Sequence, residues 1–174
     1  MLRRDDTKLV VVDVQEAFRP AVLDFERVAQ NTAVLVEGAR AMGLPVVATE
    51  QYPEGLGATV PEVAEHLPGK PLDKVRFSAA AADGFSLDGR DQVLVCGIEA
   101  HVCVSQTALA LLAEGREVHV PRDAVTSRTE ENREVGLRRM EREGAVITSV
   151  EGALFELLGA AGSEEFKTVQ RLIR

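Results

Sequence analysis

Short runs of β-branched residues alternate with longer amphipathic stretches along this chain, and this alternation limits the folds available to it. The clearest run, Leu9 to Val12, is continuous and apolar, which is typical of a strand buried on both faces. The next stretch, Phe25 to Ala41, carries apolar residues at helical spacing and is followed by Gly43 and Pro45. Repeated strand and helix patterns of this kind predict a parallel sheet whose strands are joined by helices.

The remaining elements follow the same order. Further strands are expected at 46–48, 75–77, 93–96, 117–120 and 145–148. Further helices are expected at 79–82, 102–112, 129–142, 153–158 and 164–173. The prediction is a doubly wound, Rossmann-like α/β fold of three layers, with helices on both faces of a mostly parallel β-sheet. No linker or repeat divides the chain, so we expect one domain over residues 1–174.

Composition excludes several classes of protein. The formal net charge of -8 counts against a nucleic-acid partner, because phosphate binding needs clustered positive charge. No apolar run approaches the roughly 20 residues of a transmembrane helix, and the start, Met1 to Asp6, lacks the apolar region of a signal peptide. The two cysteines, Cys96 and Cys103, provide no disulfide framework. We therefore expect a cytoplasmic protein with no membrane partner.

Polar residues stand where the predicted strands end. Ligands of open parallel sheets bind outside the carboxyl ends of the strands. The residues at these positions are Asp13, Glu50 to Tyr52, Lys74, Glu99 to Cys103, and Asp123. We expect the functional side chains to be among them, although many polar residues at strand ends only cap loops.

Cys103 is the candidate nucleophile, and it has two interpretations. A thiol in the first turn of a helix faces unpaired backbone N–H groups and the positive end of the helix dipole, which favour the thiolate. The same N–H groups could stabilise the oxyanion of a tetrahedral intermediate. Alternatively, Cys103 is a small buried side chain between Val102 and Val104. Cys96 lies inside a predicted strand, which favours a packing role for it.

Asp13 and Lys74 are candidates for catalytic roles only if they lie beside Cys103. Asp13 alone fits a loop-capping carboxylate, and Lys74 alone fits a solvated side chain. Beside the thiol, Asp13 would be a general base, and Lys74 would balance charge and keep the carboxylate ionised. Such a set suits acyl transfer through a thioester, and spacing alone leaves both interpretations open.

The sequence gives no sign of a metal or a cofactor. His66, His101 and His119 are scattered, and none belongs to a dense cluster of ligands. The glycines around Gly55 and Gly97 do not form a phosphate-binding loop, which disfavours a nucleotide binder. We expect neither a metal nor a cofactor.

Four motifs in sequence order resemble those of the isochorismatase-like cysteine hydrolases, and within them the branch of isochorismatase domain-containing proteins. The resemblance continues through 123–128 to 166–170 and so covers almost the whole chain. The motifs are Val-Val-Asp-Val-Gln at 11–15, Thr-Glu-Gln-Tyr-Pro-Glu-Gly-Leu-Gly at 49–57, Asp-Lys-Val-Arg-Phe-Ser at 73–78 and Gly-Ile-Glu-Ala-His-Val-Cys-Val at 97–104.

The resemblance implies a catalytic triad. Cys103 would be the nucleophile, Asp13 its base and Lys74 the third member. It also implies a cis peptide bond between Ile98 and Glu99, with the backbone N–H groups of Glu99 and Cys103 forming an oxyanion hole. Asp13 would take the thiol proton and later protonate the leaving amine, after which water would hydrolyse the thioester.

Two departures narrow the implied activity. Residues 50–53 contain no histidine, unlike the metal site of nicotinamidases, which counts against nicotinamide hydrolysis. The isochorismatases of siderophore synthesis lack a nucleophilic cysteine, so Cys103 counts against vinyl ether cleavage. The resemblance therefore implies a metal-independent cysteine hydrolase that cleaves a C–N bond of a small amide or ureido compound. The alternative is a catalytically silent or redox-responsive binding protein that retains the fold.

The candidate substrate contacts lie near the same strand ends. They are Gln15, Phe18, Gln51, Tyr52 and Phe77. The aromatic residues could instead belong to the core, and Gln51 could instead brace its loop. The sequence does not assign a role to His101 or Glu50. The resemblance further implies a homo-oligomer, a dimer or larger.

Overall fold

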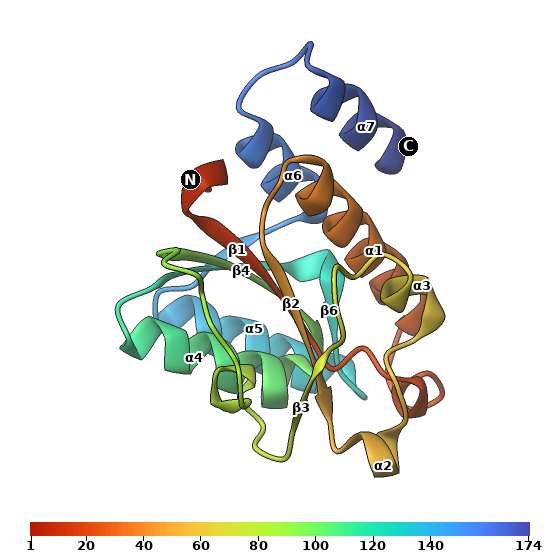
Figure 1. Cartoon of the computed structure of the whole chain (residues 1–174). Helices are drawn as coiled ribbons and strands as arrows, with labels where there is room; N and C mark the ends of the chain where they lie inside the picture. The colour runs from red at the N-terminus through yellow and green to blue at the C-terminus, as the bar shows by residue number, and fades with distance from the viewer.

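The computed structural model describes residues 1–174 as a sheet of seven strands with helices on both faces (Figure 1). The order across the sheet is β3-β2-β1-β4-β5-β7, β6 pairs with β4, and every pairing between strands is parallel. This confirms the predicted doubly wound α/β fold. The strands are β1 (Thr7–Val12), β2 (Val46–Gln51), β3 (Leu72–Lys74), β4 (Gln92–Ile98), β5 (Glu117–Pro121), β6 (Val125–Thr126) and β7 (Val146–Thr148).

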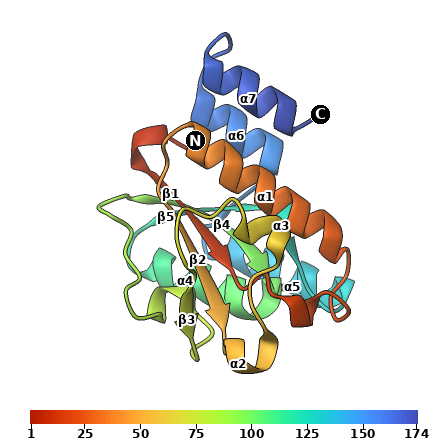
Figure 2. The same ribbon diagram turned by 45° about the vertical axis from the view of Figure 1, so that its right-hand side comes forward.

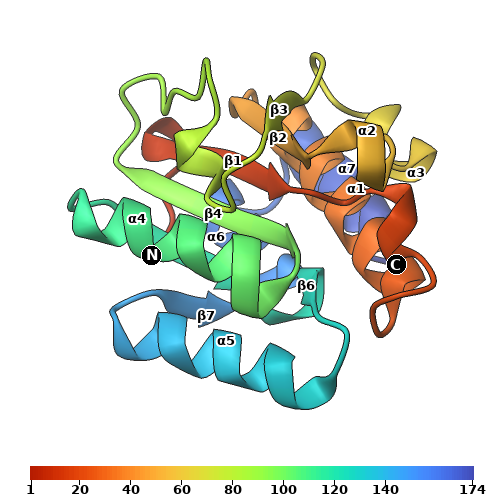
Figure 3. The ribbon, with the colours of Figure 1, turned by 90° about the horizontal axis from the view of Figure 1, so that it is seen from below.

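The longer helices form the two outer layers. Figure 3 shows α4 and α5 on one face of the sheet and α1 on the other, with α7 behind α1. Helix α6 packs on the side of α1, since its buried residues belong to the same core cluster. Figure 2 shows α6 and α7 at the opposite end of the molecule from α2. None of the helices is both long and apolar enough to cross a membrane. The helices are α1 (Phe25–Ala41), α2 (Pro53–Leu56), α3 (Pro61–Ala64), α4 (Ser105–Ala113), α5 (Glu130–Arg142), α6 (Val150–Leu158) and α7 (Glu164–Leu172).

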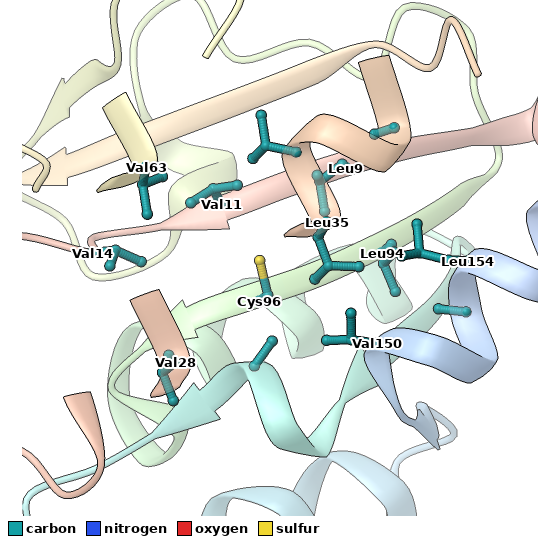
Figure 4. Packing of buried hydrophobic residues seen from close by; sticks show 14 of the residues in the cluster. Leu9, Val11, Val14, Val28, Leu35, Val63, Leu94, Cys96, Val150 and Leu154 are labelled. Atoms are coloured by element: carbon teal, nitrogen blue, oxygen red, sulfur yellow. The ribbon is translucent and has the colours of Figure 1, made fainter. Parts of the chain in front are cut away.

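Strand β1 supplies both halves of the core because its side chains alternate between the faces. Leu9 and Val11 pack in the cluster that includes α1 and α6, whereas Val10 and Val12 pack in the cluster that includes α4 and α5. Figure 4 shows Cys96 within the first of these clusters, among Val11, Leu35 and Val150. Cys96 is completely buried, in agreement with its predicted packing role.

The strand predicted at 75–77 is wrong, because the chain leaves the sheet directly after Lys74. The strand occupies Leu72–Lys74 instead and pairs with β2. After it, the backbone carbonyls of Arg76 and Phe77 turn toward the ammonium group of Lys74, at 3.3 and 2.9 Å. Val75 is consequently 79% exposed, although its β-branched side chain suggests a strand.

The helix predicted from Val102 begins differently from the prediction. A π-helical turn spans Ala100–Val104, and the α-helix itself starts at Ser105. The N–H of Ser105 still reaches back to the carbonyl of Ala100, a bond that spans five residues. Cys103 therefore lies in a widened turn before α4 and not in the first turn of an α-helix.

Gly97 allows β1 and β4 to approach each other at the end of the sheet. Its φ is +121°, and a Cβ atom at this position would lie 2.0 Å from the carbonyl oxygen of Val12. Only glycine fits such a position, since both the backbone angle and the neighbouring strand exclude a side chain.

We predict that Gly97→Ala lowers the free energy of unfolding by at least about 3 kcal/mol, because backbone overlap adds to conformational strain. Gly89→Ala is the matched control, since Gly89 has a φ of +77° and no atom within 4 Å of an added Cβ. This control should lose only about 1–2 kcal/mol. Urea unfolding of both variants tests the difference, and equal losses would contradict it.

Candidate active site

Asp13 lies at the point where the strand order of the sheet reverses. The chain moves from β1 to β2 and β3 in one direction and from β4 to β5 and β7 in the other. Asp13 directly follows β1, has a φ of 53° and is completely buried. Ligands of open α/β sheets bind at this switch point, so Asp13 has the position expected of a functional carboxylate.

Lys74 reaches Asp13 from two strands away. It is the last residue of β3, and β2 lies between β3 and β1. Neighbouring strands are about 4.8 Å apart, so only a long side chain can cross β2 to reach the end of β1. The Nζ of Lys74 donates to Oδ2 of Asp13 at 2.7 Å, and the two side chains are 1% and 0% exposed.

Both members of this pair have further hydrogen bonds. Thr49 on β2 donates through its hydroxyl to Oδ1 of Asp13 at 2.7 Å. Lys74 donates to Oε1 of Gln51 at 2.7 Å, and to the two carbonyls of the loop that follows it. A buried ion pair is favourable only when its remaining donors and acceptors are also satisfied, as they are here.

Both members of this pair change the pKa of the Cys103 thiol. Its pKa is raised to about 12, first by burial and then by the negative charge of Asp13, while Lys74 lowers it. The side chain packs in the core cluster on the α4 and α5 face, and the residue is 5% exposed. Of the two interpretations of Cys103, the shift toward the thiolate is therefore wrong, since burial and Asp13 outweigh Lys74. The resting thiol is neutral.

Glu99 connects the end of β4 to the turn that carries Cys103. The peptide bond between Ile98 and Glu99 is cis, at the position that the resemblance implies. The backbone N–H of Glu99 makes no hydrogen bond within the protein. Burial opposes ionisation of its carboxyl group, but Arg128 outweighs burial and lowers the pKa of Glu99. Arg128 donates to this carboxylate from its backbone N–H and from its guanidinium group, at 2.8 to 3.1 Å.

Helix α5 packs closely against the same turn at Gly136. A Cβ atom at Gly136 would lie 2.6 Å from the carbonyl oxygen of Ala100 and 2.8 Å from the Cα of His101. The roles of Gly136, Arg128 and Thr49 are not apparent from the sequence alone. Arg128 and Thr49 do fall within the motifs that carry the family resemblance, so those motifs already contained a signal for them.

The structure separates the five candidate substrate contacts. Tyr52 and Lys74 both line a hollow in the protein surface, which we call the hollow. Phe77 is half-exposed in the loop after β3. Phe18 packs against the core cluster of α1 and α6. Gln15 is completely buried, and Gln51 is almost so; both use their amide groups on other parts of the protein.

The hollow has a volume of about 740 Å³. Asp13 and Cys103 do not line it, whereas Lys74, which is bonded to Asp13, does. The charged residues in its wall are Glu54, Asp73, Lys74, Arg76 and Asp83. Because Lys74 is paired with Asp13, negative charge predominates in the rest of the wall.

Glu50 and His101 are both engaged with other residues. The carboxylate of Glu50 accepts bonds from the backbone and hydroxyl of Thr59, at 2.6 and 2.7 Å. His101 shares a hydrogen bond of 3.0 Å with Ser127. No group of three or more His, Cys, Asp or Glu residues is arranged to hold a metal ion.

Comparison with known proteins identifies the family. The model of the isochorismatase domain matches residues 7–152, which include Asp13, Lys74 and Cys103. The chain belongs to the isochorismatase family. The secreted isochorismatase effector Isc1 of Phytophthora sojae is 43% identical over 95% of this chain and 83% of its own length. Human isochorismatase domain-containing protein 2 is also 43% identical, over 95% of this chain and 82% of its own length.

Solved structures of other proteins show the same fold. A structure described as MAR1 ribonuclease from Caenorhabditis elegans is 37% identical, with a TM-score of 0.92 over 99% of this chain and 91% of that one. The YcaC gene product of Escherichia coli, described as an octameric hydrolase of unknown specificity, is 25% identical. Its TM-score is 0.88 over 98% of this chain and 89% of that one. The architecture is thus that of isochorismatase-family hydrolases.

We predict that alkylation of Cys103 by iodoacetamide accelerates about tenfold per pH unit from about pH 6 to pH 10, without a plateau. The reason is that the thiolate fraction grows steadily below a pKa of about 12. The Cys96→Ala variant leaves Cys103 as the only thiol, and Cys103→Ala gives the background rate. A plateau beginning below about pH 8 would show that the thiolate is already stabilised at rest.

Proposed function

We propose that this protein is a metal-independent cysteine hydrolase that cleaves a C–N bond of a small amide or ureido compound through a thioester. The observation that carries this proposal is the buried pair of Asp13 and Lys74, which acts on the thiol of Cys103. Nucleophile, base and charge support are then present at the switch point of the sheet.

The proposed reaction begins with a proton transfer. Because the thiol is neutral at rest, it must lose its proton as it attacks, and Asp13 accepts that proton while the sulfur bonds to the carbonyl carbon. The tetrahedral intermediate collapses, the C–N bond breaks, and the amine leaves with the proton from Asp13. Water then gives a proton to Asp13 and attacks the thioester, and the released sulfur recovers that proton.

The oxyanion of each tetrahedral intermediate needs hydrogen-bond donors. We assign this role to the backbone N–H groups of Glu99, which precedes the turn 100–104, and of Cys103, which lies within it. The unused N–H of Glu99 supports the assignment, as does the anchoring of Glu99 by Arg128. Fixed donors of this kind stabilise developing charge without reorganisation during the reaction.

The descriptions of two relatives support this proposal. The structure of YcaC from Pseudomonas aeruginosa, 26% identical with a TM-score of 0.87, is described with covalent acrylamide. The related structure from Escherichia coli is described as a hydrolase. The alternative of a redox-responsive binding protein is less well supported, because a thiol with a raised pKa reacts slowly with peroxides.

Small molecules suit the hollow better than RNA does, although one relative is described as a ribonuclease. Three carboxylates, those of Glu54, Asp73 and Asp83, line the open space beside Lys74. They would repel a phosphodiester backbone, and the chain as a whole carries a net charge of -8. We therefore propose a small neutral or cationic substrate and no nucleic-acid partner.

The proposal predicts an acyl-enzyme on Cys103. When a panel of small amides, carbamoyl compounds and esters is tested, intact mass spectrometry should show the acyl adduct in the wild type and in Cys96→Ala. Cys103→Ala should form no adduct and lose at least about 10³-fold in turnover, and Asp13→Asn should lose about 10²- to 10⁴-fold. Equal turnover by wild type and Cys103→Ala would exclude the mechanism, as would RNA cleavage as the only activity found.

We also propose that the protein works as a cytoplasmic homo-oligomer. Its relative YcaC is described as octameric, and the apolar side chains of Tyr52, Val75 and Phe77 are at least half-exposed in the single chain. Light scattering at micromolar concentration should therefore give a multiple of the 18.8 kDa chain mass. A mass of one chain would contradict this prediction.

A further inference from the structure

The ammonium group of Lys74 has more acceptors around it than it has hydrogens. It carries three N–H donors. Four oxygens lie within hydrogen-bond distance: those of Asp13 and Gln51 at 2.7 Å, of Phe77 at 2.9 Å and of Arg76 at 3.3 Å. No donor of Lys74 is left for a substrate. The lysine therefore acts on the reaction through Asp13 and the thiol.

Gln51 presents its oxygen to Lys74 because its nitrogen is fixed elsewhere. The Nε2 of Gln51 donates to the carbonyl of Val75 at 2.9 Å, which leaves Oε1 directed at the ammonium group. The orientation of an amide follows from such a network, since only one assignment gives each atom a suitable partner. Gln51 is also 91% buried, being 9% exposed, which keeps water from replacing it.

Gln15 holds the backbone of Gln51 in turn. Its Oε1 accepts from the N–H of Gln51 at 2.8 Å, and its Nε2 donates to the carbonyls of Gln51 at 3.0 Å and Gly57 at 2.7 Å. Gln15 is completely buried. Its amide is fully used by the protein and has no free group for a substrate.

We propose that Gln51, held by Gln15, is a positioning residue that fixes the ammonium group of Lys74 against Asp13. An uncharged acceptor suits this role, because it binds the ammonium group without competing with Asp13 for its charge. Without Gln51, Lys74 would have space to move from Asp13 toward the hollow, and its stabilising effect on the thiolate would weaken. Where it concerns turnover, this inference rests on the proposed function, whereas its effect on the thiol does not.

The test compares Gln51→Met with Glu50→Gln, both in a Cys96→Ala background. Methionine keeps the length of the side chain and removes the amide. Glu50 is the neighbouring residue on β2, and its carboxylate accepts hydrogen bonds from Thr59 and makes none with Lys74. Gln51→Asn, which withdraws the amide by one methylene group, replaces Gln51→Met if that variant fails to fold.

The readouts are the alkylation rate of Cys103 by iodoacetamide at pH 8 and, for any substrate found, kcat and KM. We expect Gln51→Met to slow alkylation about three- to tenfold, because the pKa of the Cys103 thiol would rise by up to about one unit. It should also lower kcat at least about tenfold, while KM stays within about twofold of the wild-type value. Glu50→Gln should change each value less than about twofold.

Three results would overturn the inference. They are alkylation by Gln51→Met at the wild-type rate, an equal slowing in Glu50→Gln, and a raised KM with unchanged kcat, which would indicate direct substrate contact. The two proposals can fail separately. Slower alkylation without any acyl-enzyme would retain the positioning role and reject the proposed hydrolysis, whereas an acyl-enzyme with unchanged alkylation would do the reverse.

Discussion

The ion pair between Lys74 and Asp13 joins parts of the sheet that are far apart in sequence. Lys74 ends β3, Asp13 follows β1, and β2 between them contributes Thr49 and Gln51 as hydrogen-bond partners. Removing one partner of a buried pair leaves an uncompensated charge and typically costs about 3–5 kcal/mol. The carboxyl ends of three strands thus depend on one interaction, and the loop after β3 wraps around the same ammonium group.

This pair also determines the chemistry open to Cys103. The thiol lies in the turn after β4, where both Asp13 and Lys74 influence it, and it packs in a cluster of apolar side chains. Burial and the neighbouring carboxylate keep its proton in place, while the lysine partly offsets both. In our account a single proton therefore moves between sulfur and Asp13 during the reaction, and the thiolate exists only when a carbonyl group is present to receive its electrons.

Much of the fold was predictable, because burial leaves a clear pattern in the sequence. The run from Leu9 to Val12 predicts a strand covered on both faces, and α1 spans the predicted 25–41. The prediction of a strand at 75–77 was wrong. The hydrogen bonds from Lys74 to the carbonyls of Arg76 and Phe77 turn the chain away from the sheet, despite the strand preference of Val75. The two-residue β6 is too short to leave a periodic signal. The catalytic candidates could be chosen from strand ends and family motifs. The hydrogen bonds between Gln15 and Gln51 could not, because they join residues 36 positions apart in the sequence.

We infer that Cys103 is a neutral thiol in the resting protein and transfers its proton to Asp13 only on attack. The most direct measurement is the S–H stretching band in the infrared difference spectrum of wild type minus Cys103→Ala at pH 7. We expect the band of Cys103 to be present at pH 7 and to persist to about pH 10, because the pKa of the thiol is raised to about 12. The absence of the band at pH 7 would show a preformed thiolate and would exclude proton transfer to Asp13 during the attack.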